Sequence, residues 1–274
     1  MRTSRVLENI KQGRPSLGVT LHLQDPTICE LVSLMGFDAV WLDLEHHNHS
    51  VETAASLMRA ARINHTDVIA RPGKGEFMRM SRMLEVGANG IMYPRCDSAA
   101  EAREVVKWAK YAPMGARGFD GSGADANFLL TPMKEYIRHS NANTFVIIQV
   151  EEPQALSQAD EILAIPGVDM LMLGPADYSV ITGIPGEFGH ASLKEAVEKV
   201  AQAAKRVGKH WATTSGSLEQ AKQFIGMGAS LVFHGCDLVF VKQGLDALRT
   251  SAASQLGVKF KTEYSTGKSY LETL

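Results

Sequence analysis

The chain has 274 residues, which exceeds a usual one-core domain but matches the roughly 250 residues typical of a single α/β barrel. Hydrophobic residues make up 45% of it and charged residues 21%, so the composition is that of a globular protein and excludes global disorder. Its 28 basic and 30 acidic residues are interleaved and leave a net charge of -2, which argues against a nucleic-acid groove and a polybasic membrane patch.

Short runs rich in Val, Ile, Leu and Met alternate along the chain with longer segments of helical period. After an extra helix at 5–12, strands are expected at 17–23, 39–44, 68–71, 90–94, 145–151, 170–173, 210–213 and 230–234. Helices are expected at 26–35, 51–63, 76–86, 99–110, 153–164, 193–207, 218–227 and 238–253. This alternation is typical of βα units stacked on a parallel sheet.

Glycines mark the end of several helices just before the next strand, where a left-handed residue costs least as glycine: Gly36, Gly87, Gly167, Gly208 and Gly228. Because eight βα units follow one another without a Pro- or Ser-rich linker, we expect a closed (β/α)8 TIM barrel over 1–274 rather than a doubly wound open sheet. The polar tail at 257–274 is either an arm onto a neighbouring subunit or a frayed end.

One long connection, residues 113–136, interrupts the alternation between the helix at 99–110 and the strand at 145–151. It is rich in small residues, including Gly115, Gly118, Gly121 and Gly123. Loops of this length in a compact barrel are usually lids or binding loops. We therefore expect a mobile flap here.

The cysteines and the first residues bear on the compartment. Cys29, Cys96 and Cys236 are an odd number, lie far apart and contain no CxxC pair, so they predict neither a disulfide framework nor a zinc knuckle. The first sixteen residues include no apolar signal segment, and the apolar runs are too short for a membrane span. These features predict a cytoplasmic protein.

Polar side chains follow most of the predicted strands, at the end of a parallel barrel where active sites gather. Glu151 and Asp177 follow consecutive strands, so their carboxylates could converge on one hard divalent cation. All-oxygen ligands would accept Mg, Mn or Co alike. The alternative is that each acid caps the helix that follows it.

The segment WLDLEHHNH adds three histidines and two acids at the end of the second strand. His46 is the candidate acid/base group, because histidine side chains exchange protons near neutral pH. The alternatives are a plain surface cluster or a zinc site, which lacks the HxxxH spacing. Arg71 ends the third strand and could neutralise a carboxylate or an enolate oxygen, or form a structural ion pair. No strand ends in lysine, which disfavours Schiff-base chemistry.

In order along the chain, these motifs resemble the HpcH/HpaI family of divalent-metal pyruvate aldolases. The resemblance covers about residues 17–253 and rests on DxEH, ARP, EVG, GARG, QVE, GPAD and GCD, which begin at Asp43, Ala70, Glu85, Gly115, Gln149, Gly174 and Gly235. It implies a TIM-barrel lyase that reversibly cleaves a 4-hydroxy-2-oxo acid into pyruvate, or a related 2-oxo acid, and an aldehyde. The intermediate would be an enolate stabilised by the metal.

The resemblance also implies roles for individual residues. Glu151 and Asp177 would bind the divalent cation, and Arg71 would stabilise the transition state. His46 would be the base, its basicity raised by Glu85. Gln149, Asp177 and the backbone of Ala176 would contact the substrate. Family members are commonly homohexamers, arranged as trimers of dimers, which would make the helix at 238–253 an exchanged subunit-contact element.

The chain departs from the family pattern at three places. Glu85 stands where the family usually has aspartate, and Arg95 stands where an apolar residue is common. The flap FDGSGADANF lacks the basic residues of well-known members. Arg95 and the flap lie where the aldehyde should be selected, so they leave the aldehyde open while the chemistry stays the same.

Other readings of the same residues remain. Oxaloacetate decarboxylation, or a condensation that forms a larger hydroxy acid, would pass through the same enolate. A metabolite-binding barrel without turnover is the non-enzyme alternative, but a binding module has no need of a base beside a metal. Phosphosugar binding at TTSGS, residues 213–217, is less favoured than a plain helix N-cap.

Overall fold

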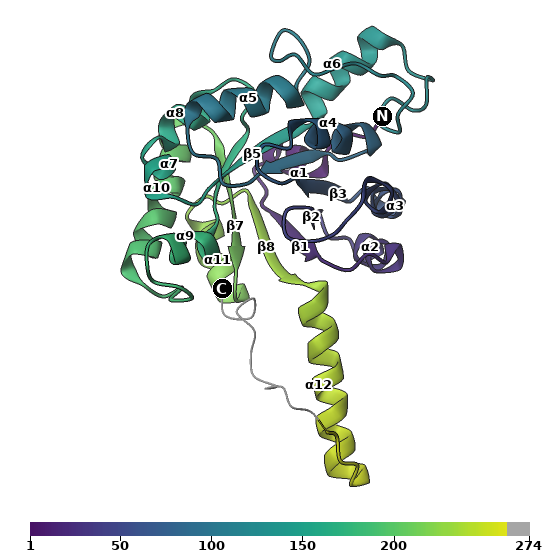
Figure 1. Cartoon of the computed structure of the whole chain (residues 1–274), viewed down its shortest axis with the longest axis vertical. Helices are drawn as coiled ribbons and strands as arrows, with labels where there is room; N and C mark the ends of the chain where they lie inside the picture. Colours follow the sequence, from purple (N-terminus) through teal and green to yellow (C-terminus); the bar gives the residue numbers. More distant parts are fainter. Residues whose placement is uncertain (262–274) are drawn as a thin grey trace.

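The computed structural model describes residues 1–261, and within that range eight parallel strands form a barrel closed in chain order (Figure 1). The strands are β1 (Ser16–Leu21), β2 (Ala39–Asp43), β3 (Asp67–Arg71), β4 (Gly90–Tyr93), β5 (Phe145–Val150), β6 (Met170–Leu173), β7 (His210–Ser215) and β8 (Leu231–Cys236). The prediction of a (β/α)8 TIM barrel is therefore confirmed. The predicted tail at 257–274 lies outside the described residues from position 262 onward.

Helices cover the barrel in the expected alternation (Figure 1). They are α1 (Arg5–Lys11), α2 (Pro26–Leu34), α3 (Val51–Ala61), α4 (Phe77–Val86), α5 (Ala99–Ala109), α6 (Met133–Asn143), α7 (Pro153–Ser157), α8 (Ala159–Ala164), α9 (Pro175–Ile181), α10 (Ala191–Val207), α11 (Leu218–Gly226) and α12 (Asp237–Leu256). The glycines predicted to end helices all have positive φ. Two helices were not expected, α6 and α9, and the helix predicted at 153–164 is divided into α7 and α8.

Alternation along the strands divides the core into two layers. In β5, Phe145 and Ile147 pack with the interior residues of the barrel, whereas Val146 and Ile148 pack with the layer beneath the helices. The interior has little room: a Cβ on Gly90 would overlap the ring of Phe145, its partner in the β4–β5 pairing. A filled interior of this kind makes the barrel a packed core and leaves chemistry to its ends.

The amino end of the barrel is closed by α1. Val6 is fully buried in the interior layer, and Leu7 and Ile10 pack against it. The buried carboxylate of Asp67, at the start of β3, accepts hydrogen bonds from Ser4 Oγ at 2.6 Å and from the backbone N–H of Val6 at 2.9 Å. These bonds hold the first turn of α1 across this end, so the carboxyl end is where a ligand can enter.

The long connection after α5 lies at the amino end, which corrects the expectation of a flap beside the substrate. Because α5 runs back toward the start of the strands, the loop that follows it begins there. The Asp125 backbone N–H donates to the Glu85 carbonyl at the end of α4, and Arg117 Nη2 donates to the Asp125 carboxylate at 3.0 Å. Within one chain, this loop therefore cannot select the aldehyde at the carboxyl end.

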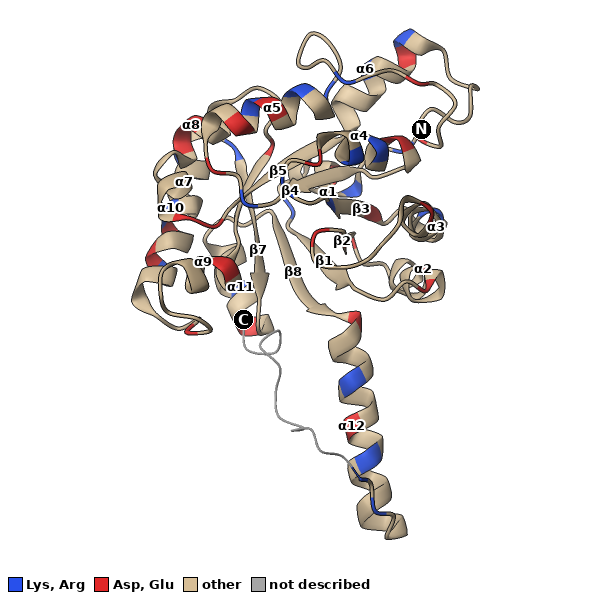
Figure 2. Ribbon diagram, viewed as in Figure 1, with Lys and Arg blue, Asp and Glu red and all other residues tan. Residues whose placement is uncertain are grey.

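The last helix leaves the barrel wall. α12 extends away from the other helices (Figure 1), and between Asp237 and Leu256 its buried residues are Asp237 and Val239. Its exposed apolar residues are Leu238, Phe240, Val241, Leu245, Leu248 and Leu256. Most of the apolar surface of α12 is therefore not covered by its own barrel. Basic and acidic residues are interspersed over the outer helices (Figure 2), and some form ion pairs, such as Arg103–Glu161 and Arg206–Asp160. Among residues 1–261, no helix is long and apolar enough to cross a bilayer.

Candidate functional site

A cavity opens at the carboxyl ends of the strands. Residues on or just after β1, β2, β3, β5, β6, β7 and β8 line it. The structure brings together here these residues predicted from the sequence: His46, Arg71, Gln149, Glu151, Ala176 and Asp177. Short parallel strands all end at this rim, so side chains distant in the sequence meet in one volume.

Arg71 is the central cation of the cavity wall and is 6% exposed. Its Nε and Nη2 donate to Oδ1 and Oδ2 of Asp43 at 3.0 and 2.7 Å, and the two residues are partners in the β2–β3 register. The guanidinium also lies 4.5 Å from the centre of the Trp41 ring. A bidentate pair fixes the plane of the guanidinium. Burial alone would raise the pKa of Asp43, but the hydrogen bonds from Arg71 outweigh it and lower that pKa.

The remaining donor of Arg71 points to the substrate side. Its Nη1 lies 3.5 Å from Oε1 of Gln149, which projects into the cavity from β5. The two sequence-based alternatives for Arg71 are therefore compatible: one edge of the guanidinium forms a structural ion pair with Asp43, and another faces the cavity. Asp43 was not among the predicted site residues, and the DxEH motif was the signal that contained it.

Glu151 follows β5 and is buried, with 1% of its surface exposed. Its Oε2 accepts a hydrogen bond from the backbone N–H of Arg95 at 3.0 Å, and Arg95 adopts φ of 48° to make it. Burial, and next the negative charge of Asp177, raise the pKa of Glu151 to about 8. A Cβ on Gly174 would overlap the Glu151 carboxylate, so glycine is required at the end of β6 to make room for it.

Asp177 stands in the first turn of α9, which begins at Pro175 directly after β6. This short helix was not predicted, because seven residues give too little periodicity. It turns the chain back over the rim and places Ala176 and Asp177 in the cavity lining. An acid in the first turn also interacts well with the helix dipole, so the capping alternative and the ligand role are compatible at this residue.

The acidic side of the cavity fits a hard divalent cation. The negative charges of Asp177 and Glu45 both raise the pKa of Glu151, so several carboxylates share this side of the barrel. Burying such a group of like charges is costly unless a cation compensates them. Carboxylate oxygens are the donors that Mg²⁺ and Mn²⁺ prefer. Glu151 and Asp177 would hold such an ion, and the donor set does not distinguish Mg from Mn or Co.

His46 lies at the outer edge of the same cavity, and 54% of its side chain is exposed. Its Nε2 is 3.6 Å from Oε2 of Glu45, whose carboxylate in turn lies 3.3 Å from Arg71 Nε. Burial, and next the neighbouring acids Asp43 and Asp177, raise the pKa of Glu45 above its ordinary value despite the opposing charges of Arg71 and His46. Glu45 is thus a site residue that sequence reasoning did not select.

Glu85 does not reach His46 within one chain, which corrects the predicted pairing. It stands in the last turn of α4, and helices of the barrel run antiparallel to the strands, so this turn lies near the amino end. Its carboxylate pairs with Arg82 at 2.9 Å, and its carbonyl accepts from the loop at Asp125. Motif order identified the residue but carried no information on which end of the barrel it occupies.

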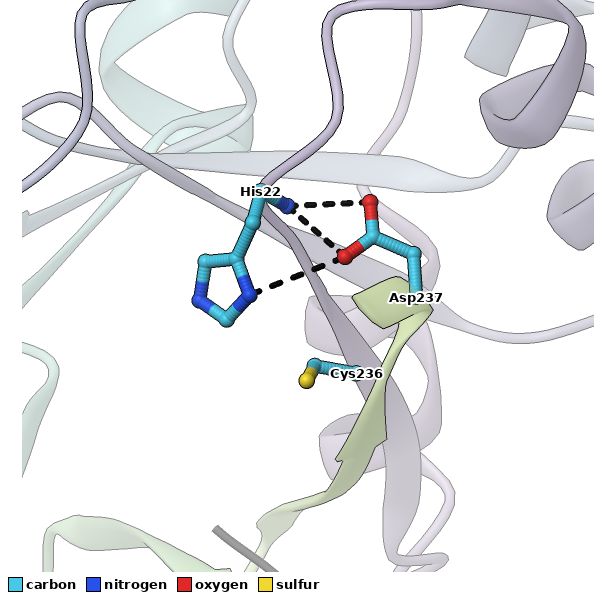
Figure 3. A group of neighbouring side chains, drawn as sticks. All are labelled: His22, Cys236 and Asp237. Atoms are coloured by element: carbon cyan, nitrogen blue, oxygen red, sulfur yellow. Dashed lines mark hydrogen bonds and ion pairs between the residues drawn. The ribbon is translucent and has the colours of Figure 1, made fainter. Parts of the chain in front are cut away.

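A second group of possible metal ligands lies at the wall of the cavity: His22, Cys236 and Asp237 (Figure 3). Nitrogen, sulfur and carboxylate donors are typical of zinc sites. The Asp237 carboxylate, however, already accepts hydrogen bonds from the backbone N–H groups of His22, Leu23 and Leu238 at 2.8 to 3.0 Å. It therefore connects the end of β1 to the start of α12, and its oxygens are not free for a metal.

Residues 17–243 match the family model described as HpcH/HpaI aldolase/citrate lyase. The chain belongs to the HpcH/HpaI aldolase/citrate lyase family. The resemblance inferred from the motifs is therefore confirmed, and the match contains every predicted site residue.

Relatives in the family are similar over nearly their whole length. The hydroxypyruvate/pyruvate aldolase of Pseudomonas aeruginosa is 29% identical over 89% of this chain and 91% of its own. The 4-hydroxy-2-oxo-heptane-1,7-dioate aldolase of Salmonella typhimurium is 30% identical over 94% of this chain and 96% of its own. These proteins are aldolases, so the expectation of a carbon–carbon lyase is confirmed.

Solved structures agree with this assignment. An HpcH/HpaI aldolase from Desulfitobacterium hafniense superposes with a TM-score of 0.87 at 27% identity, covering 93% of this chain and 98% of its own. Macrophomate synthase superposes with a TM-score of 0.80 at 26% identity, covering 92% of this chain and 90% of its own. The family fold is thus shared across proteins with different names.

Proposed function

We propose that this protein is a divalent-metal-dependent aldolase that reversibly cleaves a 4-hydroxy-2-oxo acid into an aldehyde and pyruvate, or a related 2-oxo acid. The observation that carries the proposal is the meeting of Glu151 and Asp177, from β5 and α9, in one cavity with the fixed guanidinium of Arg71. The names of the relatives support the same reaction class.

The two acids bind the cation, and the guanidinium of Arg71 stabilises negative charge on the substrate. Glu151 and Asp177 hold the cation, which supplies Lewis-acid polarisation of the substrate carbonyl when bound. Arg71, held in its plane by Asp43, stabilises the negative charge that develops on the keto oxygen. Gln149 and the backbone at Ala176 orient the oxo acid in the cavity.

His46 moves the proton at C3 of the oxo acid. Its exposed position at the rim lets it exchange that proton with solvent. Glu45 takes the place predicted for Glu85, because among residues 1–261 of one chain it is the carboxylate that lies beside the His46 ring, at 3.6 Å. A carboxylate beside the ring can orient the imidazole toward the substrate.

Two readouts test this function separately. With Mg²⁺, Mn²⁺ or Co²⁺, the protein should cleave 4-hydroxy-2-oxo acids and catalyse hydrogen–deuterium exchange at the methyl group of pyruvate, measured by NMR. Glu151→Ala or Asp177→Ala should lose both activities together with metal binding. His46→Ala should keep metal binding, measured by calorimetry, but lose the exchange. Glu152→Ala, at the adjacent N-cap of α7, is the matched control and should retain both activities. Full turnover in chelator-treated protein would contradict the proposal.

A second reaction on the same site is a condensation or a decarboxylation. The structural similarity to macrophomate synthase, which is named as a synthase, favours keeping this candidate. Each reaction passes through an enolate of a 2-oxo acid, so the same residues would serve. Incubating the protein with oxaloacetate and following carbon dioxide release, beside a screen of aldehydes with pyruvate, separates these activities.

We also propose a homo-oligomer, a hexamer built as a trimer of dimers, in which α12 is exchanged between copies. The order of a TIM barrel places the helix after β8 between α11 and α2, but α12 extends away from that position (Figure 1). Exposed apolar residues flank that position on both sides: Leu31 and Leu34 on α2, and Ile225 and Met227 at the end of α11. An α12 from a second copy would bury its own apolar face there.

Light scattering after size-exclusion chromatography tests the exchange. The double variant L245D/L248D places charges on the exposed apolar face of α12 and should give monomers. Lys242→Asp, on the same helix and already charged, is the control and should keep the assembly. A wild-type monomer at micromolar concentration would contradict the exchange while leaving the proposed reaction untouched.

A further inference from the structure

His22 stands across the cavity from the acidic side. It follows β1, while Glu151 follows β5, and in a closed eight-stranded barrel β1 and β5 are diametrically opposed. Both residues line the same cavity. An oxo acid held at Glu151, Asp177 and Arg71 would therefore extend its C4 end toward the wall that bears His22.

Asp237 holds His22 at this position in two ways (Figure 3). Its carboxylate accepts the backbone N–H of His22 at 3.0 Å, and its Oδ1 lies 3.6 Å from the ring Nδ1. The other ring nitrogen, Nε2, points away from Asp237 (Figure 3). A carboxylate beside Nδ1 favours the tautomer that carries its proton there and leaves Nε2 free to accept one. The contact with Asp237 therefore favours the tautomer in which Nε2 can act as a base.

The His22 ring is much better fixed than that of His46. Its side chain is 9% exposed, against 54% for His46. It also packs against the ring of His47, with 4.3 Å between ring centroids and a tilt of 34° between the planes. A rigid, nearly buried imidazole suits proton transfer to a substrate atom, whereas an exposed one suits exchange with solvent.

The proposed reaction needs two proton transfers at different atoms, and His46 accounts for the one at C3. We propose that His22 is the acid/base group for the C4 oxygen, an inference that rests on the proposed aldolase function. In cleavage, Nε2 of His22 takes the proton of the C4 hydroxyl. The O–H electron pair forms the aldehyde C=O, the C3–C4 bond breaks, and its electron pair forms the enolate of the oxo acid.

The charges balance over the complete reaction. The enolate is protonated at C3 to give pyruvate, and the His22 imidazolium releases its proton after the aldehyde departs. In the direction of aldol addition, the same imidazolium gives a proton to the new alkoxide. Asp237 is a positioning residue, because it acts on the substrate only through the His22 ring. Burial, and next the neighbouring His47, lower the pKa of His22, which keeps the base neutral at working pH.

The variant that tests the assignment is His22→Gln, which keeps a polar side chain but cannot transfer the proton. We expect aldol cleavage and addition to fall roughly 10²- to 10⁴-fold, the usual contribution of an acid/base group. Exchange of the pyruvate methyl protons should stay within a few-fold of wild type, because it requires no C4 oxygen. His49→Gln is the matched control, since His49 is a buried histidine near His47 that does not line the cavity in residues 1–261.

The pH profile gives a readout that a merely structural role would not change. Charged and titratable groups that face His22 are Arg71 and the following neighbours: Asp43, His47, Cys236 and Asp237. Asp237→Asn removes a charge that favours the imidazolium, so the acidic limb of kcat/KM for cleavage should move to lower pH. The acidic limb of proton exchange should not move. If His22→Gln folds poorly, His22→Ala with added imidazole replaces it, and recovery of cleavage supports the assignment.

The possible results distinguish a failure of the role proposed for His22 from a failure of the proposed aldolase function. Cleavage retained in His22→Gln, or cleavage and exchange reduced by the same factor with metal binding intact, would overturn the role of His22. Failure of imidazole to restore cleavage in a folded His22→Ala variant that still exchanges pyruvate protons would count against it as well. Wild-type protein that shows neither exchange nor cleavage with Mg²⁺, Mn²⁺ or Co²⁺ would refute the proposed function instead.

Discussion

The two ends of the barrel each bury a carboxylate, and they use it differently. Asp67 at the amino end is inaccessible to solvent and Glu151 at the carboxyl end is 1% exposed. Burial raises the pKa of Asp67 to about 6, and burial and Asp177 raise that of Glu151 to about 8. Asp67 accepts hydrogen bonds from Ser4 and Val6 and is sealed beneath α1. Glu151 instead faces an open cavity and a second acid.

This contrast shows that a raised pKa does not by itself identify a functional acid. Both groups are costly to ionise, but the cost at Asp67 is part of closing the barrel. At Glu151, a second carboxylate provides another ligand for a cation, and the open cavity gives the cation access. The criterion for function is therefore the neighbouring charge and the access to ligand, with burial common to both ends.

The largest expected effect comes from neutralising each acid in turn. Glu151→Gln should reduce aldol cleavage by on the order of 10³-fold or more, because a neutral amide is a weak ligand for a hard cation. Asp67→Asn should leave kcat/KM within a few-fold of wild type, since Asp67 contacts α1 and not the cavity. Steady-state kinetics at saturating Mn²⁺ measure both. Equal losses in the two variants would contradict the distinction between the two ends.

A smaller effect is expected from Gly174→Ala, which changes the space around Glu151 without changing its charge. The added Cβ would overlap the Glu151 carboxylate, whereas the backbone at Gly174, with φ of -87° and ψ of 96°, is open to alanine. We expect activity and metal affinity to fall roughly 10- to 100-fold, as for other changes that misplace a ligand. Gly189→Ala is the control, because a Cβ there meets no atom within 4 Å in the described residues.

Wild-type metal affinity in Gly174→Ala would show that Glu151 has another position from which to bind. Calorimetric titration with Mn²⁺ gives the affinity directly. Thermal unfolding of the metal-free variant separates a local displacement from a global loss of stability.

The sequence predicted the parts of the molecule that depend on local pattern. All eight strands were identified because each is a short apolar run bounded by turn residues, and the closing glycines marked the helix ends. Glu151 and Asp177 were found because they directly follow two of those strands. The short helix α9 was missed, since seven residues contain barely two turns.

The remaining errors concern relations that a linear pattern does not contain. Asp43 and Arg71 pair through the β2–β3 register across 28 positions, and His22 meets Asp237 across 215. Glu85 and the loop at 113–136 were predicted to lie at the site, but the direction of α4 and α5 places them at the other end of their own barrel. Which end of a helix carries a motif becomes clear only when the barrel is assembled.

The smallest expected effect is the pH dependence of stability in metal-free protein. The pKa of Glu151 in the folded state, about 8, lies above its ordinary value of 4.5, so the folded state keeps a proton that the unfolded chain releases. The stabilisation this proton gives is complete below about pH 4.5 and is lost as pH rises through 8. Asp67 behaves in the same way between its ordinary 3.8 and about 6.

The free energy of unfolding should therefore fall by roughly 2 kcal/mol between pH 6 and 8 because of Glu151, and by a similar amount between pH 4 and 6 because of Asp67. Urea unfolding in the presence of a chelator measures both slopes. Glu151→Gln should abolish the upper slope and stabilise the metal-free protein at pH 8, while Asp67→Asn should abolish only the lower one. Mn²⁺ should also remove the upper slope, because the bound cation favours the ionised carboxylate. An upper slope that survives both Glu151→Gln and Mn²⁺ would mean that another group carries the buried charge of this cavity.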